Sequence, residues 1–320
     1  MKEIGGYFEI ERFSGREYHN NCIAINTARN ALLYLLKARN INKLYLPTFL
    51  CDCISELCVY YGYKVEYYEI NERFEPILSK IPKTKEYIYI VNYYGQITNE
   101  KILSLKKNFT NIIVDNTQAF FQTPVIGIDT IYSCRTYFGV PDGAYLYTDI
   151  QMIYLIPYDY SNNRFEHLLG RFERTAHEYY ETFKKNEKSF VNEPIKYMSA
   201  LTKNILKGID YEYVKNQRNK NFAFLSERLS KSNKLEQIIM QGGAFAYPYY
   251  VDEGSAIKKH LQKAGVYVPT LWENVIDAVS PKSIEYQYSL NILPIPCDQR
   301  YGDMDMEYII SELKKYVRLD

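Results

Sequence analysis

Short apolar runs alternate with segments of helical periodicity through the first 150 residues of this 320-residue chain. Strands are expected at residues 22–25, 43–46, 65–70, 87–92 and 111–114. Helices are expected between them at about residues 27–39, 50–61 and 100–107. Strands separated by helices are typical of a mostly parallel sheet that is covered on both faces. This pattern predicts an α/β fold for the first half of the chain.

The pattern changes after residue 150. A charged helical segment is expected at 164–190 and a long helix at about 211–230. Shorter elements follow, namely strands at 243–251 and 266–268 and helices at 255–264 and 304–317. These predict a small α+β domain. We place the boundary at residue 208, with an N-terminal arm and a large domain in 1–208 and a small C-terminal domain in 209–320.

Charge and hydropathy exclude several classes of protein. The net charge of +1 gives no electrostatic footprint for nucleic acid or an anionic membrane. No apolar run approaches the roughly 20 residues of a membrane span, and no signal-peptide core is found at the start. We therefore expect a cytoplasmic protein with no membrane or nucleic-acid partner. The cysteines lack zinc-site spacing, so no metal is expected, and Cys51, Cys53 and Cys58 are interpreted as buried free thiols.

Two segments carry the candidate chemistry. An apolar run ends at Asp115 and is followed one helical turn later by Gln118, and Ser133 ends a second short run. A carboxylate at the end of a buried strand is costly without a cationic partner. A protonated pyridine is one such partner, and the alternative is an ordinary helix cap or turn aspartate. Gln118 could reach a ring hydroxyl or lie at the surface.

The segment Asn26–Leu32 begins a helix after a buried strand. The free N–H groups of a helix start suit a phosphate, although an ordinary capped helix has the same pattern. Phe49, Cys51 and Tyr93 follow strands and could approach a ring or pack in the core. Carboxylate, phosphate site and stacking side chain are three of the four groups that pyridoxal phosphate needs, and the fourth is a lysine amine.

The order of these pieces resembles the DegT/DnrJ/EryC1/StrS family of sugar aminotransferases over nearly the whole chain. The most specific element is Gly139–Gly143, read Gly-Val-Pro-Asp-Gly, after Ser133-Cys134-Arg135. Further matching segments are Gly5–Phe8, Asn26–Leu32, Tyr45–Pro47, Asn92–Gly95, Val114–Phe121 and Leu293–Tyr301. The resemblance implies a pyridoxal-phosphate (PLP) transferase of fold type I, similar to aspartate aminotransferase. It also implies a homodimer whose active sites lie at the subunit interface and a nucleotide-sugar substrate.

The resemblance also implies roles for individual residues. Asp115 would be the pyridinium partner and Gln118 the neighbour of the ring hydroxyl. The other implied cofactor-binding residues are Ser133, Ala28 and Arg29 at the phosphate, with Phe49 near the ring. Ala28-Arg29 replaces the Gly-Thr of the family's helix entry, which is a departure at the phosphate. The implied substrate-binding residues are Tyr93, Trp272 and Arg300. Trp272 could stack on a sugar or pack in the core, and Arg300 could meet a phosphate or form a surface ion pair.

Thr136 stands at the position of the family's catalytic lysine. A threonine cannot form a Schiff base, and Arg135 cannot be deprotonated to replace the amine. The resemblance therefore implies an aminotransferase-like protein of nucleotide-sugar or surface-polysaccharide metabolism whose catalysis is impaired or atypical. Any PLP or pyridoxamine phosphate (PMP) would be bound non-covalently. The alternatives are an active aminotransferase or dehydratase on a nucleotide-linked keto sugar, a non-enzymatic binding protein, or a substitution at residue 136 of this sequence.

Overall fold

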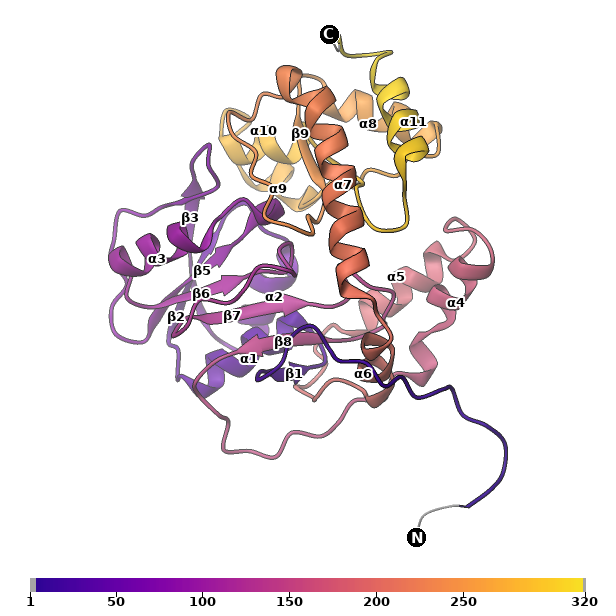
Figure 1. Ribbon diagram of the computed structural model, residues 1–320. Coiled ribbons are helices and arrows are strands. Elements are labelled where there is room, and N and C mark those ends of the chain that lie inside the picture. The colour runs from indigo at the N-terminus through magenta and orange to yellow at the C-terminus, as the bar shows by residue number, and fades with distance from the viewer. Residues whose placement is uncertain (1–3, 319–320) are drawn as a thin grey trace.

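The computed structural model describes residues 4–318, and an eight-stranded sheet forms its centre (Figure 1). The strands are β1 (Ile23–Ile25), β2 (Lys43–Pro47), β3 (Lys64–Ile70), β4 (Pro76–Ile77), β5 (Glu86–Val91), β6 (Ile112–Asp115), β7 (Asp129–Ser133) and β8 (Ala144–Tyr147). Their order is β1-β8-β7-β6-β5-β2-β3-β4. The pairs from β7 to β3 are parallel, and those at both edges are antiparallel. The predicted α/β class with a mostly parallel sheet is confirmed.

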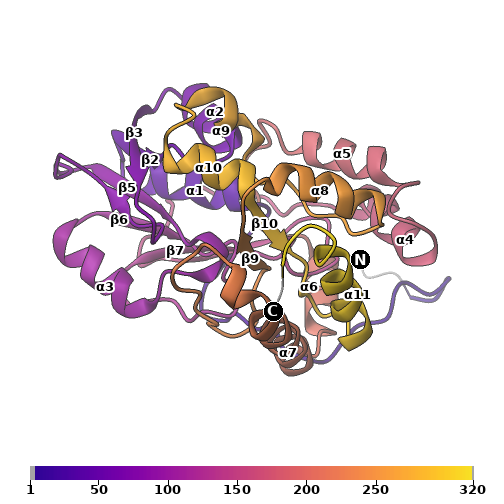
Figure 2. The ribbon, with the colours of Figure 1, turned by 90° about the horizontal axis from the view of Figure 1, so that it is seen from above.

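Helices cover both faces of this sheet. Helix α1 (Ala28–Ala38) and helix α2 (Asp52–Tyr60) lie on one side of the strands, and α3 (Asn99–Asn108) lies on the other (Figure 2). Helices α1 and α3 begin where the sequence supplies a capping hydroxyl. Thr27 Oγ1 accepts a hydrogen bond from the N–H of Asn30 at 3.1 Å. The helices predicted before residue 150 are thus confirmed.

The segment that was predicted as one helical stretch over 164–190 is two helices, α4 (Glu166–Glu173) and α5 (Tyr180–Ser189). The chain turns between them, and Thr175 Oγ1 donates to the Glu178 carboxylate at 2.7 Å within the turn. The ring of Tyr179 then packs against Gly170, where a Cβ atom would lie 2.2 Å from the ring. Periodicity alone does not reveal such a turn, because charged residues continue through it. Helix α6 (Ala200–Lys207) follows.

The C-terminal part has its own core, which a two-stranded antiparallel sheet forms together with neighbouring helices (top of Figure 1). Its elements are α7 (Tyr211–Leu229), β9 (Tyr247–Tyr250), α8 (Gly254–Lys263), α9 (Glu273–Ala278), α10 (Ile284–Asn291), β10 (Ile292–Ile295) and α11 (Asp303–Leu313). The predicted strand at 266–268 is wrong. Val266 and Val268 are buried in this core from a loop, so their alternation reflects packing and not strand pairing.

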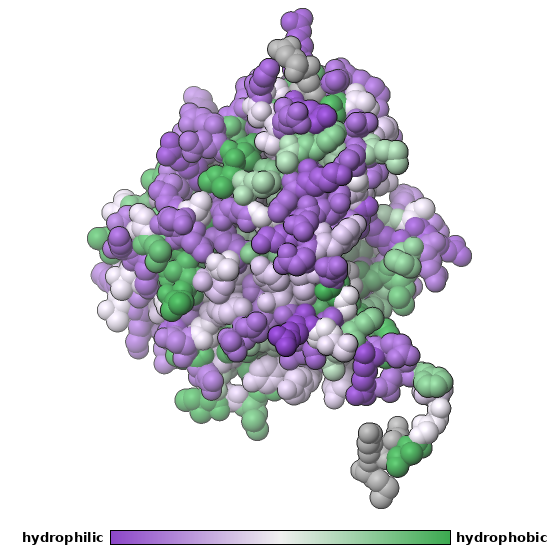
Figure 3. Space-filling view, in the orientation of Figure 1, coloured by the Kyte–Doolittle hydropathy of each residue, from purple (hydrophilic) through white to green (hydrophobic). Residues whose placement is uncertain are grey.

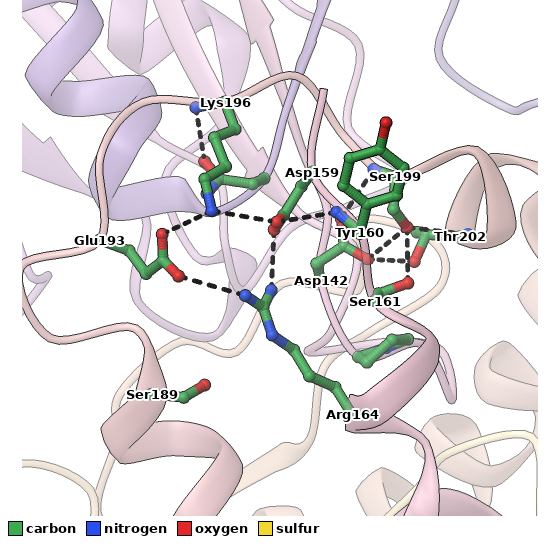
Figure 4. A network of polar contacts seen from close by, with 12 residues as sticks. Asp142, Asp159, Tyr160, Ser161, Arg164, Ser189, Glu193, Lys196, Ser199 and Thr202 are labelled. Atoms are coloured by element: carbon green, nitrogen blue, oxygen red, sulfur yellow. Dashed lines mark hydrogen bonds and ion pairs between the residues drawn. The ribbon is translucent and has the colours of Figure 1, made fainter. Parts of the chain in front are cut away.

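Buried polar contacts fix the Gly-Val-Pro-Asp-Gly turn after β7. The fully buried Asp142 accepts hydrogen bonds from the N–H and hydroxyl of Ser199 at 2.9 and 2.8 Å, and from the Thr202 hydroxyl (Figure 4). Gly143 has φ +115°, and a Cβ there would lie 3.1 Å from side chains of Met198 and Thr202. These contacts explain why the turn needs aspartate followed by glycine.

An ion-pair network lies beside this turn (Figure 4). Arg164 binds Asp159 at 2.7 Å and Glu193 at 3.2 Å, and Lys196 binds the same two carboxylates at 3.3 and 2.9 Å. The carbonyl of Lys196 accepts a hydrogen bond from the N–H of Asn26 at 2.9 Å. The network therefore connects the segment before α6 with the residue that leads into α1.

Candidate functional site

A cavity of about 210 Å³ lies at the carboxyl ends of the parallel strands β5, β6 and β7. This edge is where parallel α/β sheets generally place their ligands. Six of the ten residues singled out from the sequence line the cavity, namely Ala28, Arg29, Asp115, Gln118, Ser133 and Trp272. They come from the start of α1, from the ends of β6 and β7, and from the loop before α9. The fold therefore brings together residues that are up to 244 positions apart in the sequence.

Asp115 is the buried acid of this cavity, with only 9% of its surface exposed. One carboxylate oxygen accepts a hydrogen bond from the Tyr89 hydroxyl at 2.7 Å, and the other from the N–H of Thr117 at 2.8 Å. Burial raises the pKa of Asp115, and these hydrogen bonds offset part of the rise. Within residues 4–318 no cationic side chain pairs with this carboxylate. The site therefore favours a ligand that brings a positive charge or a proton donor to Asp115.

Gln118 lies one turn after Asp115 and fixes the backbone of a neighbouring loop. Its Oε1 accepts a hydrogen bond from the N–H of Tyr94 at 2.7 Å. Tyr94 has φ +53°, a left-handed conformation that is uncommon outside glycine. Gln118 thus has a structural role in holding the loop at Tyr94, in addition to any contact with a ligand.

The start of α1 supplies hydrogen-bond donors to the same cavity. Thr27 caps the helix through Asn30, which leaves the N–H groups of Ala28 and Arg29 as the first two of the helix without an intrahelical acceptor. The hydroxyl-bearing Ser133 at the end of β7 lines the cavity as well. Backbone donors at a helix start, a hydroxyl and a guanidinium are the groups that bind an anion such as a phosphate.

Arg135 and Glu187 form a charged pair in the cavity lining. The guanidinium of Arg135 also lies over the ring of Phe190, with 4.7 Å between its carbon and the ring centroid. Burial, together with the nearby Arg29, lowers the pKa of Arg135 to about 10, so it remains protonated at neutral pH. Its charge is balanced within the protein by Glu187.

Four of the ten residues do not line the cavity. Thr136 is partly exposed in the turn after β7. Phe49 and Tyr93 are buried behind the cavity, where the Tyr93 hydroxyl donates to the Phe49 carbonyl at 2.5 Å. Both rings pack near Trp272, with Phe49 and Trp272 centroids 4.5 Å apart. Arg300 forms an ion pair with Asp298 at 2.7 Å.

The cavity lining includes no lysine in the described chain. The sequence itself contains no lysine from residue 108 to residue 183, a range that includes β6, β7, the following turn and β8. The missing amine therefore does not depend on how the turn after Ser133 is aligned with other proteins. Residues 4–318 also contain no group of three or more His, Cys, Asp or Glu side chains that could hold a metal ion.

Several cavity residues were not assigned to the site from the sequence. Tyr89 lies in a continuous apolar strand and is indistinguishable there from a core residue, although it is two positions before the strand end that neighbours Asp115. Thr117 contributes its backbone N–H, which sequence patterns do not report. Glu187 comes from α5, far along the chain. Cys53 was interpreted as a buried thiol, yet it lines the cavity with Cys51.

A second cavity, also of about 210 Å³, is lined by residues of the segments 72–75, 96–98 and 236–239 together with Lys101. Lys101 pairs with Glu75 at 2.8 Å, so the charges of that pair are balanced. The buried carboxylate and the helix start lie at the first cavity, which we therefore consider the functional one.

Comparison with known proteins identifies solved structures with the same fold. No protein-family model matches the sequence, and no curated protein sequence does. Solved structures do match, among them a DegT DnrJ EryC1 StrS aminotransferase from Brucella abortus, with TM-score 0.63 and 14% identity over 93% of this chain and 86% of that chain. The putative sugar aminotransferase Spr1654 from Streptococcus pneumoniae, in its PMP form, has TM-score 0.65 and 14% identity over 92% and 85%. NtdA from Bacillus subtilis, with bound PMP, has TM-score 0.65 and 15% identity over 92% and 73%.

The chain thus has the fold of PLP-dependent aminotransferases of fold type I, and its structure resembles those of DegT/DnrJ/EryC1/StrS sugar aminotransferases. Spr1654 has been solved in PLP and PMP forms. In the described chain no helix is both long and apolar enough to cross a membrane.

Proposed function

We propose that this protein binds PLP or PMP non-covalently in the Asp115 cavity. The observation that carries the proposal is the buried carboxylate of Asp115, which is held by two neutral donors and has no cationic partner in residues 4–318. A protonated pyridine nitrogen supplies the missing charge. When bound, such a cofactor acts as an electron sink for bonds next to its reactive carbon.

The other cavity residues fit the remaining parts of this ligand. The N–H groups of Ala28 and Arg29, the Arg29 side chain and the Ser133 hydroxyl suit the phosphate. The hydrogen bonds from Tyr89 and Thr117 orient the Asp115 carboxylate before any ligand arrives. Preorganised partners of this kind reduce the entropy that binding costs.

The same residues argue against efficient transamination. Proton transfer by a positioned group is worth roughly 100- to 10,000-fold in rate, and no lysine is present in the cavity lining of the described chain to perform it. We therefore propose an aminotransferase-like protein of nucleotide-sugar and surface-polysaccharide metabolism with impaired or atypical catalysis. The sugar aminotransferases among its structural neighbours support the sugar assignment. Trp272 in the cavity lining is the side chain suited to stack on a sugar.

We further propose that the protein is a homodimer. Large apolar side chains are exposed on three segments, and the hydrophobic surface is visible near α4 and along the lower margin of Figure 3. These side chains are Ile4, Tyr7, Phe8, Ile153, Tyr154, Leu155, Leu169 and Phe172. Exposed apolar clusters of this kind often mark subunit contacts. Light scattering should report a dimer at micromolar concentration, and Leu155→Asp together with Phe172→Asp should shift it to a monomer. A monomeric wild type would refute this part of the proposal.

Ligand-dependent stability tests the cofactor proposal. Protein in buffer is compared with protein in PMP or PLP, both by thermal unfolding and by calorimetric titration. A ligand at a hundredfold excess over its dissociation constant stabilises the folded state by about 2.7 kcal/mol. Asp115→Ala should remove this stabilisation, whereas Asp52→Ala, which alters an exposed carboxylate at the start of α2, should keep it. If wild type unfolds at the same temperature with and without millimolar ligand, the protein is not a cofactor binder.

A further inference from the structure

Cys51 and Cys53 bring two thiols together in the wall of the Asp115 cavity. Their sulfur atoms lie 2.7 Å apart, and both residues line the cavity. Cys51 precedes α2 in an extended conformation, and Cys53 is the second residue of the helix. Two sulfurs this close are well inside the separation of non-bonded neighbours and about 0.7 Å beyond the length of a disulfide bond. The start of α2 therefore places the two thiols within reach of each other.

The surroundings make the two thiols chemically different. The pKa of Cys53 is lowered, first by the hydrogen bond with Cys51 and also by the positive charge of Arg29, although burial and the nearby carboxylates of Asp52 and Asp115 oppose this shift. Its place in the first turn of a helix favours the thiolate too. The pKa of Cys51 is raised, first by the same hydrogen bond and then by burial. Cys53, which has Arg29 nearby and lies in the first turn of α2, is therefore the better placed of the two thiols to attack an electrophile.

Other cysteines of the chain lack this environment. Cys58 lies in the same helix but is fully buried, and burial raises its thiol pKa to about 12. Burial likewise raises the pKa of Cys22 to about 12. Thiolates are the reactive form of cysteine, so these two residues are expected to be inert under conditions where Cys53 reacts. They provide internal controls for the pair.

We propose that Cys51 and Cys53 form a redox-active dithiol site that peroxides oxidise to an intramolecular disulfide. The Cys53 thiolate attacks one oxygen of the peroxide. An S–O bond forms, the O–O bond breaks, and with hydrogen peroxide one water leaves after protonation. Cys51 then attacks the resulting sulfenic acid, so that the S–S bond forms, the S–O bond breaks and a second water leaves. In total, two thiols lose two electrons and two protons to one peroxide.

The proposed disulfide is reversible because both cysteines line the cavity, where a small dithiol can reach them. It joins residues separated only by Asp52, across the junction between a loop and a helix. A dithiol reductant therefore returns the pair to its reduced form, and the protein can cycle between two states of the same cavity wall.

Thiol counting and mass spectrometry test the proposal on the folded, full-length protein. Reduced protein is treated with one equivalent of hydrogen peroxide at neutral pH and then alkylated. We expect two of the six thiols to be lost, and the peptide with Cys51 and Cys53 to be lighter by two hydrogens. Dithiothreitol should restore both thiols. Because Cys58 lies on the same tryptic peptide, 44–64, the Cys58→Ala variant is analysed in parallel and should behave like wild type.

Single variants distinguish Cys53, which attacks the peroxide, from Cys51, which attacks the sulfenic acid that forms. In Cys51→Ser, Cys53 should accumulate as a sulfenic acid that dimedone traps. In Cys53→Ser, the peroxide reaction at residue 51 should be at least tenfold slower than the reaction of wild type. Cys22→Ser should leave the pair unchanged. The proposal is overturned if all six thiols of the folded wild type survive peroxide, or if Cys53→Ser reacts as fast as wild type. Neither result depends on whether the cavity binds a cofactor.

Discussion

The cavity lining contains two acidic side chains that differ in how their charge is compensated. Asp115 is bound by a hydroxyl and a backbone N–H, both neutral, and its pKa is raised by burial. Glu187 is bound by the guanidinium of Arg135, so its charge is balanced inside the protein. A buried charge is tolerated when it is paired and is costly when it is not. The comparison indicates that Asp115 is the carboxylate suited to a cationic ligand, whereas the charge of Glu187 is already paired within the protein.

The same comparison separates binding from catalysis. Under the proposed function, the residues around Asp115 bind a pyridine ring and its phosphate, whereas Arg135 and Glu187 lie in the cavity lining near the turn where an amine would be required. The proposed cofactor site therefore has a carboxylate and candidate phosphate-binding groups in its lining, but no lysine in the described chain that would tether the ligand. Substitutions of Asp115 and of Glu187 should therefore have different effects on ligand binding and on the free energy of unfolding.

The largest difference should appear in ligand affinity. Asp115→Ala should weaken PMP binding by roughly 100-fold or more, because removing one member of a buried charge pair typically costs about 3–5 kcal/mol. Glu187→Gln should weaken it by tenfold at most, since Arg135 would still be present in the cavity wall. Isothermal titration calorimetry measures both constants. Equal losses in the two variants would mean that Asp115 is not the specific partner of the ligand.

Introducing a lysine at residue 136 tests whether the cavity lacks only the amine that would tether the cofactor. Wild type should form no PLP adduct that survives borohydride treatment and dialysis. Thr136→Lys should form one at the introduced amine, and its PLP retention half-time should rise at least tenfold. Peptide mass spectrometry after reduction locates the adduct, and Thr136→Arg is the matched control with a long cation that cannot condense. A borohydride-stable lysine adduct in wild type would show that the tethering residue lies elsewhere.

The phosphate contacts should have a smaller effect. Ser133→Ala removes one hydroxyl that would donate to an anion, and hydrogen bonds to charged groups are worth about 1.5–3 kcal/mol. We therefore expect a loss of roughly 10- to 100-fold in PMP affinity. Pyridoxamine, which has no phosphate, should bind wild type and Ser133→Ala equally well. If pyridoxamine loses affinity to the same degree, Ser133 acts on the shape of the cavity and not on the phosphate.

The sequence predicted the strands and helices before residue 150 better than the contacts that form the site. Strand runs such as 87–92 are continuous and apolar because both faces of a parallel sheet are covered, and this pattern is local. The break between α4 and α5 and the loop burial of Val266 and Val268 depend on tertiary packing, so periodicity missed them. Asp115 could be singled out because a strand-end carboxylate is unusual.

The roles of the remaining site residues could not be predicted from the sequence, because they also depend on tertiary contacts. Tyr89 resembles any other core tyrosine, and its hydroxyl becomes informative only when the structure places it 2.7 Å from Asp115. Tyr93 and Phe49 resemble ring-stacking residues by position, yet they pack behind the cavity. The proximity of Cys51 and Cys53 depends on where α2 begins, and the sequence does not determine helix boundaries to one residue.

The smallest predicted effect concerns the free energy of unfolding without ligand. Because burial raises the folded-state pKa of Asp115, the folded chain binds its proton more tightly than the unfolded chain, whose carboxyl titrates near 3.9. Linkage then requires Asp115 to stabilise the folded state less as the pH rises from the unfolded pKa through the folded pKa. Above the folded-state pKa of Asp115, the cost of burying the ionised carboxylate lowers the free energy of unfolding by its full amount. A substitution that removes this charge should therefore raise the free energy of unfolding.

Asp115→Asn should therefore increase the stability of the ligand-free protein at neutral pH by about 1 kcal/mol, the typical size of a single-substitution effect. The gain should vanish at low pH, where the wild-type carboxyl is protonated. Glu187→Gln should instead destabilise at neutral pH, since it leaves the largely buried Arg135 without its counter-charge. Urea unfolding at several pH values measures all three proteins. A loss of stability in Asp115→Asn at neutral pH would mean that the Tyr89 and Thr117 hydrogen bonds outweigh the burial of the charge, and the contrast between the two acids would not hold.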